Sequence, residues 1–262
     1  MIPPTSIDGT DITGATIDGT DVQEITVDGD VVFSAEQLPV AYSNLVAWYP
    51  ARNSGADATA GDTNSGDSTD YGGTLGSGAS IVSGGGVTDL DTGANSDAFD
   101  FDGSNDAEVV TNTGGVNLFG ADDEGCFTFW VKDDGGGNPH PFGNFDDDDF
   151  IYYDLEDGDW SINGSSGMAS LSGPTLGLNW YFIVLNYGST VEYYSTEEGE
   201  SSINLRDTDS NVGSVFLDND IYFGDIGPSS NLPLDGKMDD IRIYNRSLSQ
   251  SELQGIFDNT TP

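Results

Sequence analysis

The sequence has few basic residues and almost no cysteine, and each scarcity excludes a class of function. Six Lys and Arg stand against 46 Asp and Glu, which gives a formal net charge of −40 over 262 residues. Six scattered cations cannot form the positive stripe that binds nucleic acid or an anionic membrane surface. The single cysteine, Cys126, rules out an internal disulfide, and its apolar neighbours predict a buried, unreactive side chain.

Long apolar runs are also missing. No stretch approaches the roughly 20 apolar residues that are needed to cross a bilayer. The amino terminus, MIPPTSIDGTD, has neither the positive start nor the apolar centre of a secretory signal. We therefore expect no membrane insertion and no signal-directed export.

The acidic residues are spread along the whole chain and do not form a tail. In dilute buffer such a chain repels itself, whereas at about 1 M salt the screening length falls to about 3 Å. The composition therefore predicts a protein that works in a high-salt environment. Aromatic residues make up 11% of the chain and lie in strand-like runs, so they offer a hydrophobic core and argue against disorder.

A ten-residue repeat occupies the amino-terminal part of the chain. Ile7–Asp11, Ile17–Asp21 and Val27–Val31 each contain an Asp-Gly pair between β-branched residues, which is a strong hairpin signal. Such short strands bury little surface alone. We expect a β-rich attachment module that assembles as a homo-oligomer, either a trimer or a pentamer, on a larger structure.

The repeat sets the predicted domain boundaries. Residues 1–35 form the attachment module, residues 36–43 form a linker marked by Pro39, and residues 44–262 form the main domain. Residues 53–97, which are rich in Gly, Ser, Thr and Asp, are expected to be a long surface loop or a pair of loose hairpins.

Apolar runs separated by glycine and aspartate turns fill the main domain. This pattern predicts an all-β fold, an antiparallel two-sheet sandwich. Ser249 and Glu252 form a capping box, which predicts one short helix over about Gln250–Phe257. The predicted strands lie within Leu45–Pro50, Ala98–Val110, Cys126–Lys132, Phe150–Tyr153, Trp160–Ile162, Trp180–Tyr187, Val191–Tyr194, Val215–Leu217, Ile221–Phe223 and Met238–Tyr244.

Several of these segments resemble a known family. Leu45–Pro50, the FDGxxD element at Phe101–Asp106, Ile221–Asp225 and the segment Leu234–Leu253 resemble, in this order, elements of the concanavalin-A-like and laminin-G-like jelly-roll domains. The resemblance covers roughly residues 44–258 and implies a jelly-roll sandwich with lectin-like binding. The amino-terminal repeat is similar to segments in structural proteins of tailed viruses of haloarchaea, a shorter match.

Catalytic residues are not expected. Asp154 and Glu156 could share one strand face as a glycosidase pair, but Gly158 follows at once and favours a turn. His140 lies between glycines and prolines, which favours a surface loop over a base beside a nucleophile. We therefore predict that the protein is not an enzyme.

Calcium is the one cofactor that we consider, because the resemblance implies a calcium site at a sheet rim. Asp102 and Asp106 of the FDGxxD element are the candidate metal ligands, since calcium prefers carboxylate oxygens. The competing explanation is that these acids belong to a surface adapted to salt.

Sugar binding would use flat aromatic faces beside polar groups. Adjacent tyrosines in a strand point to opposite sheet faces, so one ring of each pair is expected to be exposed. Two phenylalanines in a predicted loop are hard to explain as core. The candidate ligand-binding residues are Phe142, Phe145, Tyr152, Tyr153, Tyr193 and Tyr194.

Three of the cations, Lys237, Arg242 and Arg246, lie in the closing segment near Asp239 and Asp240. We expect these cations to form structural ion pairs.

Together these features predict a surface structural protein of a halophilic virion, such as a head decoration, turret, spike or tail fibre. Its expected place is outside the cell, in a high-salt environment, and its expected activity is adhesion to a host surface glycan or glycoprotein. The alternatives are a purely structural decoration without a ligand, a cellular haloarchaeal adhesin, and a glycosidase.

Overall fold

The computed structural model forms two compact units, Met1–Pro39 and Val40–Pro262. No helix in the described part of the chain is long and apolar enough to cross a membrane. The residues that the structure describes are 6–7, 10–11, 16–17, 20–21, 24–27, 30–34, 45–49, 51, 73–76, 78–89, 94–95, 97–104, 108–110, 124–135, 139–145, 150–164, 167–210, 213, 221–226, 232–260 and 262.

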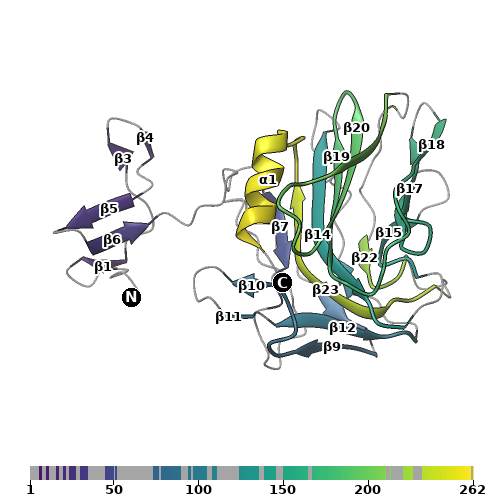
Figure 1. Ribbon diagram of the computed structural model, residues 1–262, viewed down its shortest axis with the longest axis horizontal. Coiled ribbons are helices and arrows are strands. Elements are labelled where there is room, and N and C mark those ends of the chain that lie inside the picture. The colour runs from purple at the N-terminus through teal and green to yellow at the C-terminus, as the bar shows by residue number, and fades with distance from the viewer. Residues whose placement is uncertain are drawn as a thin grey trace. The chain divides into compact units, whose positions relative to one another are not determined.

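The first unit contains three β-hairpins (Figure 1), and in the sequence one Asp-Gly pair of the repeat separates the two strands of each. The hairpins therefore recur with the repeat, as the Asp-Gly pairs predict. The paired strands are β1 (Ser6–Ile7) with β2 (Thr10–Asp11), β3 (Thr16–Ile17) with β4 (Thr20–Asp21), and β5 (Glu24–Val27) with β6 (Asp30–Ser34).

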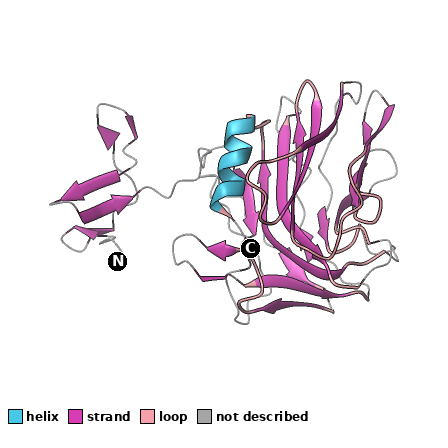
Figure 2. Cartoon of the chain, viewed as in Figure 1, coloured by secondary structure: helices cyan, strands magenta, loops and turns pink. Residues whose placement is uncertain are grey.

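The second unit is a sandwich of two antiparallel sheets, as predicted (Figures 1 and 2). The larger sheet has eight strands. Seven of them, in pairing order, are β21 (Leu205–Asp209), β20 (Val191–Glu197), β19 (Tyr181–Tyr187), β14 (Gly125–Asp133), β23 (Asp235–Tyr244), β12 (Ala98–Asp102) and β9 (Ala79–Val82). The eighth strand, β7 (Leu45–Tyr49), pairs with β23 on the same side as β12, and β14 pairs with the other side of β23.

The smaller sheet has seven strands. A separate hairpin joins β10 (Thr88–Asp89) to β11 (Ala94–Asn95). The seven strands, in pairing order, are β18 (Gly167–Leu171), β17 (Asp159–Gly164), β16 (Phe150–Asp154), β15 (Phe142–Phe145), β22 (Ile221–Phe223), β13 (Glu108–Val110) and β8 (Gly73–Leu75).

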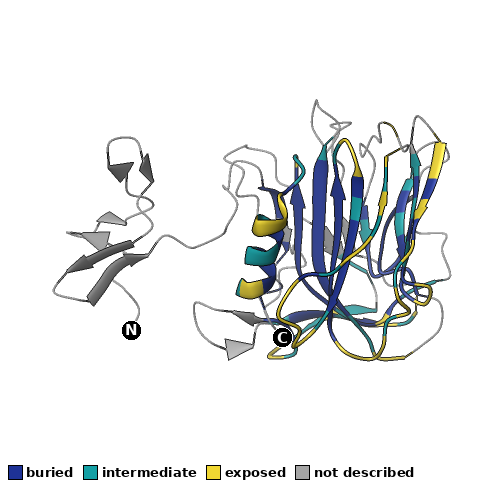
Figure 3. Cartoon of the chain, turned by 45° about the horizontal axis from the view of Figure 1, so that its top comes forward, coloured by how far each residue is buried: buried dark blue, intermediate teal, exposed yellow. Residues whose placement is uncertain are grey.

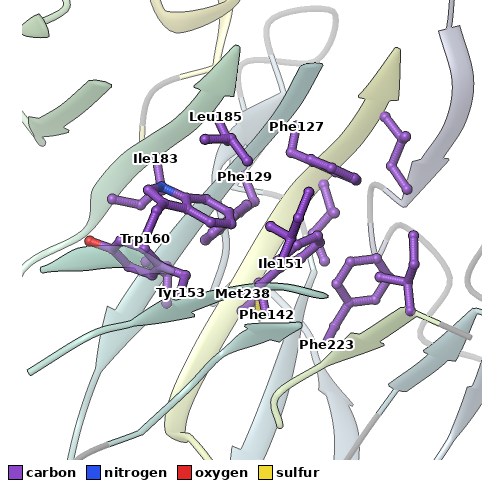
Figure 4. Packing of buried hydrophobic residues seen from close by; sticks show 14 of the residues in the cluster. Phe127, Phe129, Phe142, Ile151, Tyr153, Trp160, Ile183, Leu185, Phe223 and Met238 are labelled. Carbon is purple, nitrogen blue, oxygen red and sulfur yellow. The ribbon is translucent and has the colours of Figure 1, made fainter. Parts of the chain in front are cut away.

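The main hydrophobic core lies between the two sheets (Figure 4). The ring of Phe142, from the seven-stranded sheet, packs against Phe127 of the eight-stranded sheet at 4.7 Å and against Trp160 at 5.5 Å between centroids. Each buried aromatic side chain removes about 150–250 Å² from water. This layer of rings is therefore the main source of stability that joins the sheets.

A second core lies on the outer face of the eight-stranded sheet, under the helix α1 (Gln250–Asn259). Phe257 stacks on Trp130 at 5.6 Å, and the Trp130 indole N–H donates to the Thr260 hydroxyl at 3.1 Å. The predicted capping box is confirmed, because the Ser249 side chain accepts from the Glu252 amide and Glu252 accepts from Ser249. The helix therefore begins where the sequence predicts.

The sequence-based prediction differs from the structure at several strands. The segment around Phe142 forms β15 and not a loop. Residues 53–97 are expected from the sequence to be a long surface loop or a pair of loose hairpins; their described part contains the hairpin β10–β11 and also β8 and β9, which pair with strands of the two sheets. Strands β18 and β21 were not predicted at all. All of these strands are short, and each gains its backbone partners from segments far along the chain or from a neighbouring hairpin.

Candidate ligand-binding face

The two sheets differ in how their outer faces are covered. Every residue of β19 is buried, because the core lies on one side of this strand and the helix layer on the other. In β16, by contrast, the residues alternate between half-buried and buried along the strand. Figure 3 shows this difference as continuous dark blue in the central strands of the eight-stranded sheet and mixed colours in the seven-stranded sheet. The outer face of the seven-stranded sheet is thus partly open to solvent.

A row of side chains crosses this outer face from strand to strand. Backbone register aligns Tyr222 with Gly143, Gly143 with Tyr152, Tyr152 with Ser161, and Ser161 with Ser170. Paired residues of antiparallel strands share one face of the sheet. The row spans four inter-strand steps, or about 19 Å at the usual spacing of about 4.8 Å. We refer to these five residues as the tyrosine–serine row.

Gly143 has a specific packing role within the tyrosine–serine row. A Cβ atom at this position would lie 2.6 Å from the Cγ2 atom of Ile226, far inside normal contact. The half-buried side chain of Ile226 therefore lies against the glycine, between the two tyrosines of the row. The position between the two tyrosines is therefore filled by an aliphatic side chain.

Tyr152 lies among other rings. Its centroid is 5.6 Å from that of Phe150, in a stacked arrangement, and 5.1 Å from the imidazole of His140. His140 Nε2 lies 3.5 Å from a carboxylate oxygen of Asp154. Phe150 therefore lies against one face of the Tyr152 ring and His140 packs beside it, while the residue as a whole stays half-buried.

His140 is not the surface histidine that its glycine- and proline-rich neighbours suggest, because only 5% of its surface is exposed. Its amide donates to the Leu232 carbonyl at 2.9 Å. The flanking prolines also connect neighbouring segments, since the carbonyl of Pro139 accepts from Leu155 and that of Pro141 from Gly224. These bonds join the segment around His140 to Leu155 and to the segment that contains Gly224 and Leu232.

Polar groups surround the tyrosine–serine row on both sides. Register places Asn163 beside Phe150 and Met168 beside Asn163, and Met168 is 73% exposed. On the other side of the row, the backbone register of β16 and β17 places Asp154 opposite Asp159. The outer face therefore combines aromatic rings, hydroxyl groups and an amide with a pair of carboxylates.

Phe142 is not part of this face, and its prediction as a contact residue is wrong. The side chain is fully buried between the sheets, where it stacks on Phe129 at 5.8 Å. The alternation of β15 turns Phe142 inward and Gly143 outward, which the sequence could not show without the strand. Phe145 ends the same strand, opposite Phe150, and its role as a ligand-binding residue stays a prediction.

The tyrosine pairs are only partly as predicted, because one of the four rings is accessible. Tyr153 and Tyr193 meet in the core, where their hydroxyl groups lie 2.8 Å apart, and burial raises the pKa of both. Tyr194 lies in the second core and donates to Glu192 at 3.0 Å. Exposure of one ring in that pair is expected from the sequence, but the second core covers the outer face of the eight-stranded sheet at Tyr194. Only Tyr152 is half-buried.

Of the two predicted calcium ligands, the structure describes only Asp102. Asp102 is exposed at the end of β12, and one of its carboxylate oxygens accepts from the amide of Ser104 at 3.0 Å and from its hydroxyl at 2.5 Å. Asp106 lies outside the described residues. The described residues contain no group of three or more acidic, His or Cys side chains that could hold a metal ion. Calcium binding stays a prediction.

Asp154 ends β16 and Glu156 lies in the hairpin turn that follows, as the sequence analysis favoured. Residues 155–158 form the turn between β16 and β17, and the Asp157 amide donates to Asp154 at 3.1 Å. Gly158 has a φ of 70°, the left-handed conformation that glycine adopts cheaply.

The cations in the described part of the chain belong to the eight-stranded sheet and the turn that follows it. The predicted structural pairing is confirmed for Arg242, which pairs with Asp240 at 2.9 Å, and for Arg246, which pairs with Glu252 at 2.6 Å. Lys237 pairs with Asp100 and Asp134. The seven strands of the smaller sheet contain no Lys or Arg in their sequences.

No family model matches the sequence, and neither does any curated protein. Solved structures do share the fold. Domain 4 of AbnA, a GH43 extracellular arabinanase from Geobacillus stearothermophilus in complex with arabinotriose, has a TM-score of 0.55 at 15% identity, over 80% of this chain and 97% of that chain. The binding domain of botulinum neurotoxin serotype D has a TM-score of 0.59 at 13% identity, over 83% and 52%.

A third similar structure is the Trypanosoma rangeli sialidase, with a TM-score of 0.55 at 16% identity, over 90% of this chain and 35% of that chain. This chain spans about half the length of the toxin binding domain. At these identities the likeness establishes a shared jelly-roll-like β-sandwich fold.

Proposed function

We propose that this protein is a lectin-like adhesion protein that binds a host surface glycan or glycoprotein through the outer face of its seven-stranded sheet. One observation carries the proposal: the central strand β19 of the eight-stranded sheet is buried on both faces, whereas the seven-stranded sheet presents half-buried rings and hydroxyl groups in register across its open face. Ligand sites commonly combine aromatic surface with a few placed polar groups.

The similar structures support this proposal by analogy. One is a domain in complex with arabinotriose, and another is a binding domain of a toxin. These properties belong to those proteins, and a shared fold alone does not transfer them. They do show that the sandwich serves as a binding domain in other proteins.

We further propose that the protein is a structural protein on the surface of a halophilic virion. The support is the net charge of −40, which suits molar salt, and the resemblance of the ten-residue repeat to structural proteins of haloarchaeal tailed viruses. The three hairpins of the first unit would then mediate attachment to the particle as a homo-oligomer. No enzymatic activity is proposed.

The test is binding of the purified protein to intact haloarchaeal cells in multi-molar KCl, before and after their surface glycans are removed. We expect saturable binding that is lost with the glycans and weakened in Tyr152→Ala. Leu205→Ala is the matched control, because Leu205 is half exposed on β21 of the other sheet.

A folded protein that binds no cells in any state of assembly would overturn the adhesion proposal. That result would favour the alternative of a purely structural decoration. Sedimentation in the same buffer reports the oligomeric state, and circular dichroism reports the fold, so that failure to bind can be separated from failure to assemble.

A further inference from the structure

We infer that the ligand of this face is a neutral glycan chain that lies across the strands along the tyrosine–serine row, and that glycans bearing carboxylate or sulfate groups are excluded. This inference rests on the proposed adhesion function and adds the chemical class of the ligand and its direction. It follows from the charges and the geometry of the seven-stranded sheet.

The charge of the face sets the ligand class. No strand of this sheet contains Lys or Arg, so an anionic sugar would find no cationic partner on the strands. The backbone register places Asp154 opposite Asp159 at the turn between β16 and β17, so two carboxylates lie at this end of the face. The Asp154 carboxylate also lies near His140. In molar salt the screening length is about 3 Å, so repulsion between an acidic sugar and more distant carboxylates is weak. Direct contact between the sugar's anionic group and a carboxylate still costs the desolvation of both charges.

The geometry sets the direction of the ligand. Aromatic rings of the row come from β22 and β16, and hydroxyl groups come from β17 and β18, so the row changes from stacking groups to hydrogen-bonding groups over about 19 Å. The hydroxyl groups of a neutral sugar can both donate to and accept from Ser161 and Ser170. A chain along the strands would instead meet Phe150, Tyr152 and Asp154 in succession and would end on a carboxylate.

The direct test uses immobilised oligosaccharides of defined charge in multi-molar KCl. The neutral probes are linear tetrasaccharides of glucose, mannose, galactose or arabinose. The acidic probes are tetrasaccharides of uronic acids and sulfated forms of the neutral set. We expect binding to at least one neutral probe, none to its sulfated form, and a loss of about ten-fold or more in Tyr152→Ala.

A charge-insertion variant makes the test independent of Tyr152. Ser170→Lys adds a cation at the exposed end of the tyrosine–serine row, so it should gain binding to the sulfated form of the preferred probe. Leu205→Lys adds the same charge to the edge strand β21 of the other sheet and should not gain it. Both positions are exposed, and neither change disturbs the core.

The outcomes separate this inference from the adhesion proposal. Binding to acidic probes only would overturn the inference and leave adhesion standing. Neutral binding that is unchanged in Tyr152→Ala, together with no gain in Ser170→Lys, would place the site elsewhere and also overturn it. Failure to bind cells or any glycan would overturn both proposals.

Discussion

Glu252 joins the helix α1 to the turn that precedes it, and its charge state can be tested directly. Its carboxylate accepts from Arg246 Nη2 at 2.6 Å, from Arg246 Nη1 at 3.2 Å and from the Ser249 amide at 2.8 Å. The Arg246 hydrogen bonds, followed by those from Ser249, lower the pKa of Glu252 from 4.5 to about 2. The folded protein thus holds Glu252 ionised more strongly than the unfolded chain does.

The sign of the pH dependence follows from this difference. Because the pKa is depressed in the folded state, ionised Glu252 stabilises the protein above about pH 4.5, and this contribution is lost as the pH falls toward about 2. Full conversion of the shift would give roughly 3 kcal/mol. The pair lies near the surface, where salt and water weaken such interactions, so we expect about 1 kcal/mol.

The perturbation is Glu252→Gln, which keeps a cap acceptor and removes the charge. Urea unfolding in constant KCl, followed by tryptophan fluorescence from pH 7 down to pH 2, gives the free energy of unfolding of each protein. We expect the difference between wild type and variant to be about 1 kcal/mol at pH 7 and to vanish near pH 2. Glu156→Gln, in the exposed β16–β17 turn, is the matched control and should show little difference.

A difference that stays constant across this pH range would refute the reasoning, because it would show that the cap geometry and not the charge of Glu252 provides the stability. A difference that grows as the pH falls would contradict the sign itself.

Three further predictions follow from the packing and the charges. Phe257→Ala removes the ring that stacks on Trp130 and should lower the free energy of unfolding by about 3–5 kcal/mol, measured with urea; a loss below 1 kcal/mol would mean that the helix contributes little. His140→Gln should weaken glycan binding in a titration while near-ultraviolet circular dichroism stays unchanged, because His140 positions Tyr152; unchanged affinity contradicts this role. Lowering KCl from multi-molar to below about 0.1 M should lower the thermal midpoint, and a midpoint independent of salt argues against adaptation to brine.

The parts of the fold that sequence predicts well are those encoded locally. The Asp-Gly hairpins and the capping box of Ser249 and Glu252 each depend on a few consecutive residues, and each forms as expected. Long apolar runs such as β14 and β19 also appear where their composition predicts.

The parts that sequence misses depend on distant partners. Phe142 looks like a loop residue because a Gly- and Pro-rich segment precedes it, yet pairing with β16 and β22 makes it a core strand. Alternation alone predicts that Tyr193 and Tyr194 point to opposite faces, but it cannot show that the helix layer covers the second face. His140 is buried for the same reason, since contacts with Leu232 and Asp154 come from other parts of the chain.

The unequal covering of the two sheets has a consequence for how this protein can change over time. A substitution at Trp160 alters the shared core, whereas one at Ser161, the next residue along the same strand, alters only the outer face. Surface substitutions usually change stability by less than about 0.5 kcal/mol. Selection could therefore diversify the recognised partner through alternate positions of a few strands, while the residues between them keep the scaffold constant.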